Sequence, residues 1–239
     1  MRSIIENFSK ELEQLTAQNV ESVCADCETS FMTDESEYFE VCQNCGDKAA
    51  AEEEDKKKED RRRAGIRRWE GLTPKLYRTT DVDHPTFNRD LYDLVQSWES
   101  VDGLGLGIQG GPGTSKTRIM FLLLKRMAIE GHSFATVSGS DFASLAQNQF
   151  TQGSTFAKKV LEWKRAGFLL LDDLDKAPRW TDRTESELFE VLEARVNQMR
   201  PTLWTANCSL EEIVGRMTSH RGPAIMRRLE QFTKIYDLG

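Results

Sequence analysis

Residues 104–117 of this 239-residue chain read LGLGIQGGPGTSKT, a short apolar run that passes into a glycine-rich turn and then into the helical stretch 118–130. This is the strand, loop and helix context of a P-loop, in which backbone N–H groups and a helix N-terminus surround phosphate. Lys116 is placed to reach the β and γ phosphates of ATP, and Thr117 to bind Mg²⁺. The predicted phosphate-binding residues are Gly110, Gly111, Pro112, Gly113, Thr114, Ser115, Lys116 and Thr117.

One position departs from the usual P-loop pattern, because residue 115 is serine where the pattern G-x-x-x-x-G-K-[ST] has glycine. Serine is small and polar, and it is compatible with the helical geometry of a first turn. We therefore expect the phosphate cradle to form with Ser115 in it.

A second motif, FLLLDD at residues 168–173, is an apolar strand that ends in two carboxylates. Ligands of open α/β sheets bind at the carboxyl ends of the strands, so these side chains belong beside the P-loop. Asp172 matches the acid that organises Mg²⁺. Asp173 stands where related ATPases usually carry the glutamate that orients the attacking water, and its shorter side chain predicts slow hydrolysis.

From Trp69 onward, short β-rich runs alternate with helical stretches, which predicts an α/β fold with a parallel sheet flanked by helices. The predicted strands are residues 104–109, 133–137, 167–172, 202–205 and 233–238. The chain stops directly after the fifth of them, so we expect no helical lid after the sheet.

Four cysteines near the N-terminus form the array C-x2-C-x14-C-x2-C. Two such pairs supply a closed tetrahedral shell for a structural zinc ion, which would stabilise a segment too small for a core of its own. We predict a small zinc-ribbon-like module whose ligands are Cys24, Cys27, Cys42 and Cys45, with Phe31, Tyr38, Phe39 and Val41 as its apolar residues. Cys208 has no partner at such a spacing.

The first 51 residues contain three basic and eleven acidic side chains, a net charge of −8. Because phosphate would be repelled there, we interpret the zinc module as a protein-docking element and not as a DNA-binding one. Before it, apolar residues at helical spacing predict an amphipathic helix over residues 3–18. This helix either packs on the zinc module or inserts into a groove of a partner.

The predicted domain boundaries follow from composition. Residues 1–50 hold the helix and the zinc module, residues 51–68 are a charged and nearly core-free helical linker, and residues 69–239 form the P-loop domain. Five arginines at the end of the linker are candidates for DNA contact, although a charge run is usually a solvated face: Arg61, Arg62, Arg63, Arg67 and Arg68.

No window of the sequence reaches the roughly 18 consecutive apolar residues of a membrane span, and its start lacks the apolar run of a secretory signal. We therefore expect a cytoplasmic protein with no membrane contact and with reduced cysteines.

Over residues 66–239 the chain resembles the AAA+ helicase loaders of the DnaC and DnaI type and their relative, the transposition ATPase IstB. The resemblance rests on five stretches in order: LTPKLY at 72–77, the P-loop, FLLLDDLDK at 168–176, LWTAN at 203–207 and IMRRL at 225–229. It implies an AAA+ ATPase domain without a C-terminal lid.

The resemblance also implies roles for single residues. Asn207 matches the sensor that reads the γ-phosphate. Arg228, or its neighbour Arg227, matches the arginine finger that reaches the ATP of the next subunit, a contribution of about 10³ or more in rate in related reactions. The stretch 72–77 matches the segment that flanks adenine.

In the resembling family, loops inside a helical oligomer hold single-stranded DNA, and the matching stretches here are residues 148–156 and 177–186. They interleave aromatic and basic side chains, a pattern that suits base stacking but that is also found in ordinary polar loops. The residues are Phe150, Lys158 and Lys159, then Arg179, Trp180 and Arg183.

Together these features predict an ATP-dependent loader that docks a replicative hexameric helicase through the zinc module and self-associates through its ATP sites on single-stranded DNA. Two alternatives remain open at this point. One is an IstB-like regulator that recruits a transposase, and the other is a small P-loop kinase-like enzyme with a small-molecule acceptor.

Overall fold

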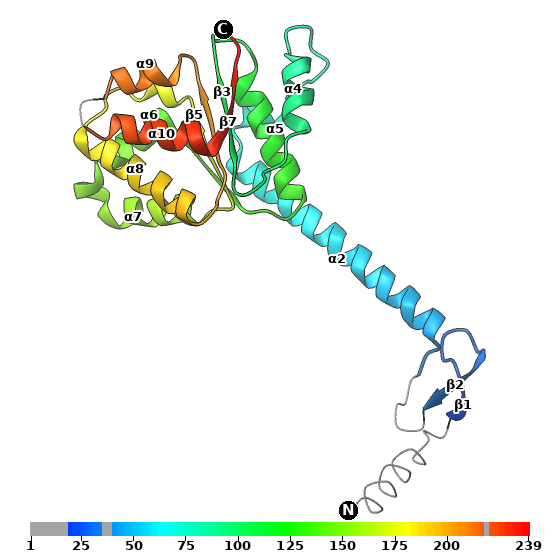
Figure 1. Ribbon diagram of the computed structural model, residues 1–239. Helices are drawn as coiled ribbons and strands as arrows, with labels where there is room; N and C mark the ends of the chain where they lie inside the picture. Colours follow the sequence, from blue (N-terminus) through cyan, green and yellow to red (C-terminus); the bar gives the residue numbers. More distant parts are fainter. Residues whose placement is uncertain (1–18, 35–39, 218–219) are drawn as a thin grey trace, which may run out of the picture. The chain divides into compact units, whose positions relative to one another are not determined.

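The computed structural model describes residues 19–34, 40–217 and 220–239. The chain divides into two compact units, residues 1–60 and residues 61–239, and each is described by itself (Figure 1). The helix expected over residues 3–18 lies outside the described residues. Tyr38 and Phe39, two of the apolar residues predicted for the zinc module, also lie outside them. No helix in the described part of the chain combines the length and the apolar character needed to cross a bilayer.

The first unit contains an antiparallel hairpin. Strand β1 (Asn19–Val23) pairs with β2 (Ser30–Asp34), with Asn19 opposite Asp34 and Val23 opposite Ser30. Helix α2 (Gln43–Leu72) begins in this unit and includes all of the charged segment expected to be a helical linker. Its exposed face carries i,i+4 ion pairs such as Lys57 with Glu53 at 2.6 Å, which favour a solvated helix.

The second unit is built on a five-stranded parallel sheet, which confirms the predicted fold class. The strands are β3 (Gly105–Gln109), β4 (Phe134–Ser138), β5 (Phe168–Asp172), β6 (Thr202–Ala206) and β7 (Thr233–Asp237). Their order across the sheet is β4-β5-β6-β3-β7, so β5 and β3 are separated by β6. Each strand begins and ends within one residue of its prediction.

Helices cover both faces of this sheet (Figure 1). Alternate residues of β5 enter different cores: Leu169 and Leu171 face one side, and Phe168 and Leu170 face the other. This period of two is the geometry of an extended strand buried on both faces. On the first face lie α6 (Gly139–Gln147), α7 (Gln149–Arg165), α8 (Asp182–Asn197), α9 (Leu210–Gly215) and α10 (Gly222–Phe232).

The other face is covered by α4 (Arg89–Gln96), by α5 (Lys116–Ile129) and by the last turns of α2. Trp69 of α2 is buried, and its indole N–H donates to the carbonyl of Phe121 at 2.7 Å. Gly65, one turn earlier, lies so close to α5 that a Cβ atom would be 1.9 Å from the Ala128 carbonyl oxygen. The end of the charged helix is therefore an integral part of the second unit.

A buried tryptophan ties three strands together. Trp204 of β6 is fully buried, lies across Gly107 of β3, and donates its indole N–H to Thr233 Oγ1 of β7 at 3.0 Å. A Cβ atom on residue 107 would be 2.2 Å from the Trp204 ring, so only glycine fits there. Trp204 therefore holds β6, β3 and β7 in register with one another.

Arg195 of α8 has no solvent exposure, and its guanidinium group donates only to uncharged oxygens. Its partners are the carbonyls of Trp163, Ala166, Gly167 and Pro201 and the hydroxyl of Thr202, at 2.6–3.3 Å. These groups lie at the end of α7 and at the starts of β5 and β6. Arg195 therefore joins the amino-terminal ends of β5 and β6 to α7, at the end of the sheet opposite the P-loop, and we call this set of hydrogen bonds the Arg195 clamp.

Candidate nucleotide-binding site

The P-loop occupies the turn between β3 and α5. Gly110 and Gly113 have φ angles of 132° and 81°, which glycine adopts without the penalty that a side chain brings. Gly110 also lies against the chain end, where a Cβ atom would be 2.7 Å from Leu238 Cβ. The loop therefore has the backbone path that lets N–H groups turn inward toward an anion.

Ser115 corrects one expectation. We expected it in right-handed helical geometry, but it precedes the helix as the N-cap of α5 with φ 66° and ψ 10°, in the left-handed region. Its side chain makes no capping hydrogen bond. The usual glycine of the pattern is explained by this backbone, because a left-handed residue with a Cβ atom is strained by about 1–2 kcal/mol.

Lys116 is 4% exposed and is held inside the loop. Its ammonium group donates to the carbonyls of Gly110 and Gly111, both at 2.7 Å, and to Thr114 Oγ1 at 3.1 Å. Burial lowers the pKa of Lys116, with nearby carboxylates acting in the opposite direction. The cation is thus already at the phosphate cradle and is satisfied by backbone oxygens that a phosphate can replace.

Thr117 and Asp172 meet below the loop. The Thr117 hydroxyl donates to Asp172 Oδ1 at 2.9 Å, and Thr205 Oγ1 of β6 donates to the same oxygen at 2.7 Å. Burial raises the pKa of Asp172, and the two hydroxyl hydrogen bonds oppose this shift. A hydroxyl and a carboxylate oxygen placed side by side are hard ligands of the kind that Mg²⁺ prefers.

Asp173 turns away from Asp172 at the end of β5, with φ 49°. Its backbone N–H donates to Thr205 Oγ1 at 2.8 Å, and its Oδ2 atom pairs with Lys176 Nζ at 2.5 Å. The amide of Asn207 lies 3.5 Å from Asp173 Oδ1 and 3.3 Å from Asp175 Oδ2. The structure thus brings the predicted sensor and the predicted water-orienting acid together, and sequence reasoning assigned no role to Lys176.

An open cleft of about 410 Å³ runs along these groups. Leu76 and Tyr77, in the stretch expected to flank adenine, line it together with the P-loop, Asp173 and Asn207. The Tyr77 ring stacks on Phe121 at 5.1 Å, and Arg118 lies over the same ring while donating to the Leu76 carbonyl at 3.2 Å. Arg118, which sequence reasoning missed, therefore anchors this segment to α5.

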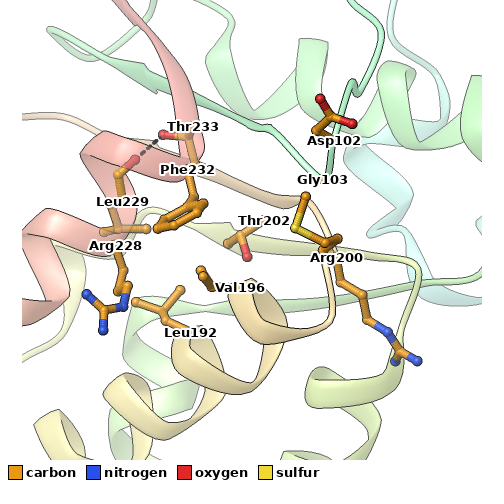
Figure 2. Close-up of a pocket in the computed structure, with 11 residues that line it drawn as sticks. Asp102, Gly103, Leu192, Val196, Arg200, Thr202, Arg228, Leu229, Phe232 and Thr233 are labelled. Atoms are coloured by element: carbon orange, nitrogen blue, oxygen red, sulfur yellow. Dashed lines mark hydrogen bonds between the residues drawn. The ribbon is translucent and has the colours of Figure 1, made fainter.

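Arg228 lies far from the P-loop of its own chain. It is on α10, next to a cavity of about 10 Å³ lined by residues that begin β3, β6 and β7, such as Thr202 and Thr233 (Figure 2). Because the P-loop follows the other end of β3, Arg228 faces away from its own cleft. Its guanidinium pairs with Glu193 at 2.7 Å and lies over Phe189, whereas Arg227 is exposed.

Trp180, the aromatic residue proposed for the second DNA-binding stretch, is buried, and this part of the interpretation is wrong. Trp180 is 2% exposed, and Phe156, which ends the first such stretch, is 3% exposed, so neither is available to stack on a base. Both belong to the core on the first face of the sheet, Phe156 from α7 and Trp180 from the segment that precedes α8. The side chain of Phe150 lies outside the described residues.

Among the basic residues, Arg183 pairs with Glu187 at 2.7 Å and Lys159 with Glu162 at 2.9 Å, while Lys158 and Arg179 are exposed. At the end of the charged helix, Arg68 donates to the Phe134 carbonyl at 3.1 Å. That arginine supports the sheet and is not a free cation for DNA.

The four N-terminal cysteines converge. Their sulfur atoms all lie within 4.8 Å of one another, and Cys27 Sγ is 3.7 Å from Cys42 Sγ. Zinc–sulfur bonds of about 2.3 Å in a tetrahedron require sulfur separations of about 3.8 Å, so the donor set fits zinc. The backbone N–H of Cys42 donates to Cys24 Sγ at 3.2 Å and, with further backbone hydrogen bonds, lowers the pKa of Cys24 to about 6, whereas the neighbouring thiols raise the pKa of Cys45.

No model of a known protein family matches this sequence. The replicative helicase loader DnaI of Bacillus subtilis is 25% identical over 151 residues, which cover 61% of this chain and 48% of that protein. A solved structure of DnaI superposes on 72% of this chain and 97% of its own, with a TM-score of 0.56 and 19% identity. AMPPCP-bound DnaA from Aquifex aeolicus superposes with a TM-score of 0.55 and 22% identity, covering 70% of this chain and 50% of that one.

The second unit has the AAA+ fold. A solved structure of the DnaC helicase loader supports the same fold, since its whole chain superposes on 70% of this one with a TM-score of 0.53 and 21% identity. The resemblance to DnaC- and DnaI-type loaders is thus confirmed, and the AAA+ unit carries it. The chain spans about half the length of the curated relative it matches.

Proposed function

We propose that this protein is an ATP-dependent helicase loader whose AAA+ unit binds MgATP in the cleft beside the P-loop. The observation that carries the proposal is the meeting of Thr117 and Asp172 below the P-loop, in a fold shared with DnaI and DnaC. A kinase-like enzyme would also need a pocket for an acceptor, which the proposed loader does not require.

In this proposal the residues of the cleft have separate tasks. Backbone N–H groups of residues 110–115, among which Pro112 supplies none, hold the phosphates, and Lys116 exchanges its carbonyl partners for phosphate oxygens. Thr117 and Asp172 hold Mg²⁺, which neutralises phosphate charge when bound. Tyr77 and Leu76 border the base.

Asp173 and Asn207 are the residues that promote ATP hydrolysis in this proposal. Asp173 accepts a hydrogen bond from the attacking water, and the Asn207 amide, within reach of both Asp173 and Asp175, orients the same water or the γ-phosphate. A short carboxylate already engaged in an ion pair supports slow hydrolysis. ATP then acts chiefly as a switch between bound and released states.

Self-association uses Arg228. Its position at the end of the sheet away from its own P-loop supports action on the ATP of a neighbouring subunit and not on its own. For this contact Arg228 must give up Glu193, a partly exposed pair that contributes about 0.2–1 kcal/mol. Single-stranded DNA is held in the oligomer through phosphate contacts from exposed cations such as Lys158 and Arg179, without base stacking by Trp180.

The zinc module binds the helicase. Its charge does not suit DNA, and its hairpin exposes Val23 and Met32, each 63% accessible. Apolar side chains exposed on an acidic module are typical of a protein-docking surface. In the proposed arrangement residues 1–50 serve docking and residues 69–239 bind ATP, while the helix over 51–68 links them and packs on the AAA+ unit at its end, at Gly65 and Arg68.

The experiment that tests the proposal measures nucleotide and helicase binding in the same preparation. Lys116→Ala should abolish binding of a fluorescent ATP analogue, because its ammonium group is held by carbonyls of the phosphate-binding P-loop, while the surface variant Lys234→Ala should bind normally. Immobilised full-length protein should retain a hexameric replicative helicase, and a protein lacking residues 1–51 should not. Unchanged affinity in Lys116→Ala, or capture of a transposase in place of a helicase, would contradict the proposal.

A further inference from the structure

Lys176 is a cation at the nucleotide cleft to which the ATPase motifs assign no task. It ends the short 3₁₀ turn η1 (Leu174–Lys176) and lines the cleft together with Lys116 and Asn207. Its ammonium group pairs with Asp173 Oδ2 at 2.5 Å. The side chain is 58% exposed, so it contributes little to the hydrophobic core.

The turn itself creates this pair. In a 3₁₀ helix the side chains of residues three apart lie one above the other, and Asp173 and Lys176 are three apart. The turn is closed by the Lys176 N–H donating to the Asp173 carbonyl at 2.9 Å, and it is fastened to β6 by the Asp173 N–H on Thr205 Oγ1. The contact therefore forms without any ligand.

Both oxygens of Asp173 are engaged as a result. Oδ1 faces the Asn207 amide at 3.5 Å, and Oδ2 is covered by Lys176. A carboxylate that orients an attacking water must direct an open acceptor site toward it. The ion pair with Lys176 fixes the orientation of the Asp173 carboxylate, so the carboxylate cannot turn toward an attacking water until Lys176 moves.

We propose that Lys176 restrains ATP hydrolysis by holding the Asp173 carboxylate, so that this ion pair opens before Asp173 orients water. The inference rests on the proposed function, in which Asp173 is the water-orienting acid, and Lys176 is a positioning residue that acts through it. Because partly exposed ion pairs are weak, the restraint is modest, about fivefold at most in rate.

The test is steady-state ATPase kinetics of the full-length protein with saturating MgATP. Lys176→Met keeps the aliphatic chain and removes the charge, and its kcat should rise between about twofold and about fivefold. Lys176→Arg keeps a cation and should retain the low rate. In an Asp173→Asn background, Lys176→Met should bring no gain, because no carboxylate is released, and Lys56→Met on the exposed part of α2 controls for loss of a lysine.

A kcat that is unchanged or lower in Lys176→Met, an effect confined to KM, or an equal gain in the Asp173→Asn background overturns the restraint. Titration of a fluorescent ATP analogue into the same samples separates the two levels of the argument. If the parent protein binds ATP and Lys176→Met brings no gain, the restraint alone fails. If the parent protein does not bind ATP, the proposed function fails and the restraint fails with it.

Discussion

At residue 115 the chain combines a side chain with a backbone conformation that side chains disfavour. Replacing Ser115 by glycine should raise the free energy of unfolding by about 0.5–1 kcal/mol, since the relief of strain exceeds the added freedom of glycine in the unfolded chain. Urea unfolding of the AAA+ unit measures the change.

Ser144→Gly is the matched control for this substitution. Ser144 lies exposed within α6, where the backbone is helical, so glycine there should destabilise by about 0.5–1 kcal/mol. Equal effects of the two substitutions would show that residue 115 is not strained.

A second prediction concerns Asp172. Burial raises the pKa of this carboxyl above the ordinary value of 3.8. The folded state therefore holds a proton on this carboxyl more firmly than the unfolded chain does. The ionised form destabilises the protein above the raised pKa, and this cost disappears as the pH falls through that value toward 3.8. Asp172→Asn should raise the Tm of the nucleotide-free protein at neutral pH, by an amount that shrinks toward acid pH.

The same substitution should remove the Mg²⁺ dependence of nucleotide affinity, measured by titration with and without the metal. Asp90→Asn, at an exposed carboxylate in the first turn of α4, should change neither property. A lower Tm for Asp172→Asn at neutral pH would refute the sign of this argument.

Residues that carry motif chemistry were the easiest to predict, because a P-loop constrains residue types at fixed spacing. Gly113, Lys116 and Asp173 line one cleft, and Asp172 accepts a hydrogen bond from Thr117 at its side. The left-handed angle of Ser115 and the ion pair of Lys176 were missed, because both depend on the path of the backbone. Trp180 was misread because an aromatic beside arginines has the same pattern whether it faces solvent or a core.

At the scale of elements, Arg195 joins α7, α8, β5 and β6 through five hydrogen bonds to uncharged groups. Arg195→Met should destabilise the AAA+ unit by about 3 kcal/mol or more, because each buried carbonyl left without a donor costs about 1–3 kcal/mol. Arg195→Lys should also be destabilising, since one ammonium group does not span all five acceptors. Guanidinium unfolding gives both values.

Arg165→Lys, at an exposed position of the neighbouring α7, serves as the control and should change stability by less than about 0.5 kcal/mol. If Arg195→Lys proved as mild as this control, the clamp would not depend on the guanidinium geometry.

Helix α10 carries the prediction for assembly. Arg228→Ala should leave ATP binding intact and should lower ATP-dependent association, because the residue lies away from its own cleft and is proposed to reach the ATP of a neighbour. Arg227→Ala, one residue away and exposed, shows which of the two arginines is the finger. Analytical ultracentrifugation with and without ATP measures association, and full assembly of both variants would count against a finger on this helix.

The strands were predictable to within one residue because each is a short apolar run between turn-forming residues. Their order in the sheet was not, since no local pattern states that β6 lies between β3 and β5. Arg195 gave no signal either, because an arginine in an amphipathic helix is ordinarily a solvated residue.

At the scale of the whole molecule, the two compact units predict that zinc binding and ATP binding can be lost independently. A strong chelator should remove one zinc per chain and unfold the hairpin of the first unit, because Cys24 is the one buried apolar residue among residues 19–34 and 40–60, while the AAA+ unit still binds ATP. Elemental analysis and nucleotide titration on the same sample measure the two outcomes.

Cys24→Ser with Cys45→Ser should reproduce the chelator effect, whereas Cys208→Ser should retain zinc because Cys208 belongs to the AAA+ unit. Loss of ATP binding together with zinc would show that the units are not independent. Composition alone separated an acidic cysteine-bearing part from the rest of the chain, but it did not show that the helix that follows ends inside the AAA+ core.

The clamp around Arg195 has a consequence for handling the protein. Since its partners are neutral oxygens enclosed in protein, dissolved ions do not screen it, whereas the proposed contacts of Arg228 with a neighbouring nucleotide and of exposed cations with DNA phosphate weaken as ionic strength rises. Concentrated salt should therefore detach subunits and nucleic acid while the ATPase fold stays intact, which offers a gentle way to recover single chains.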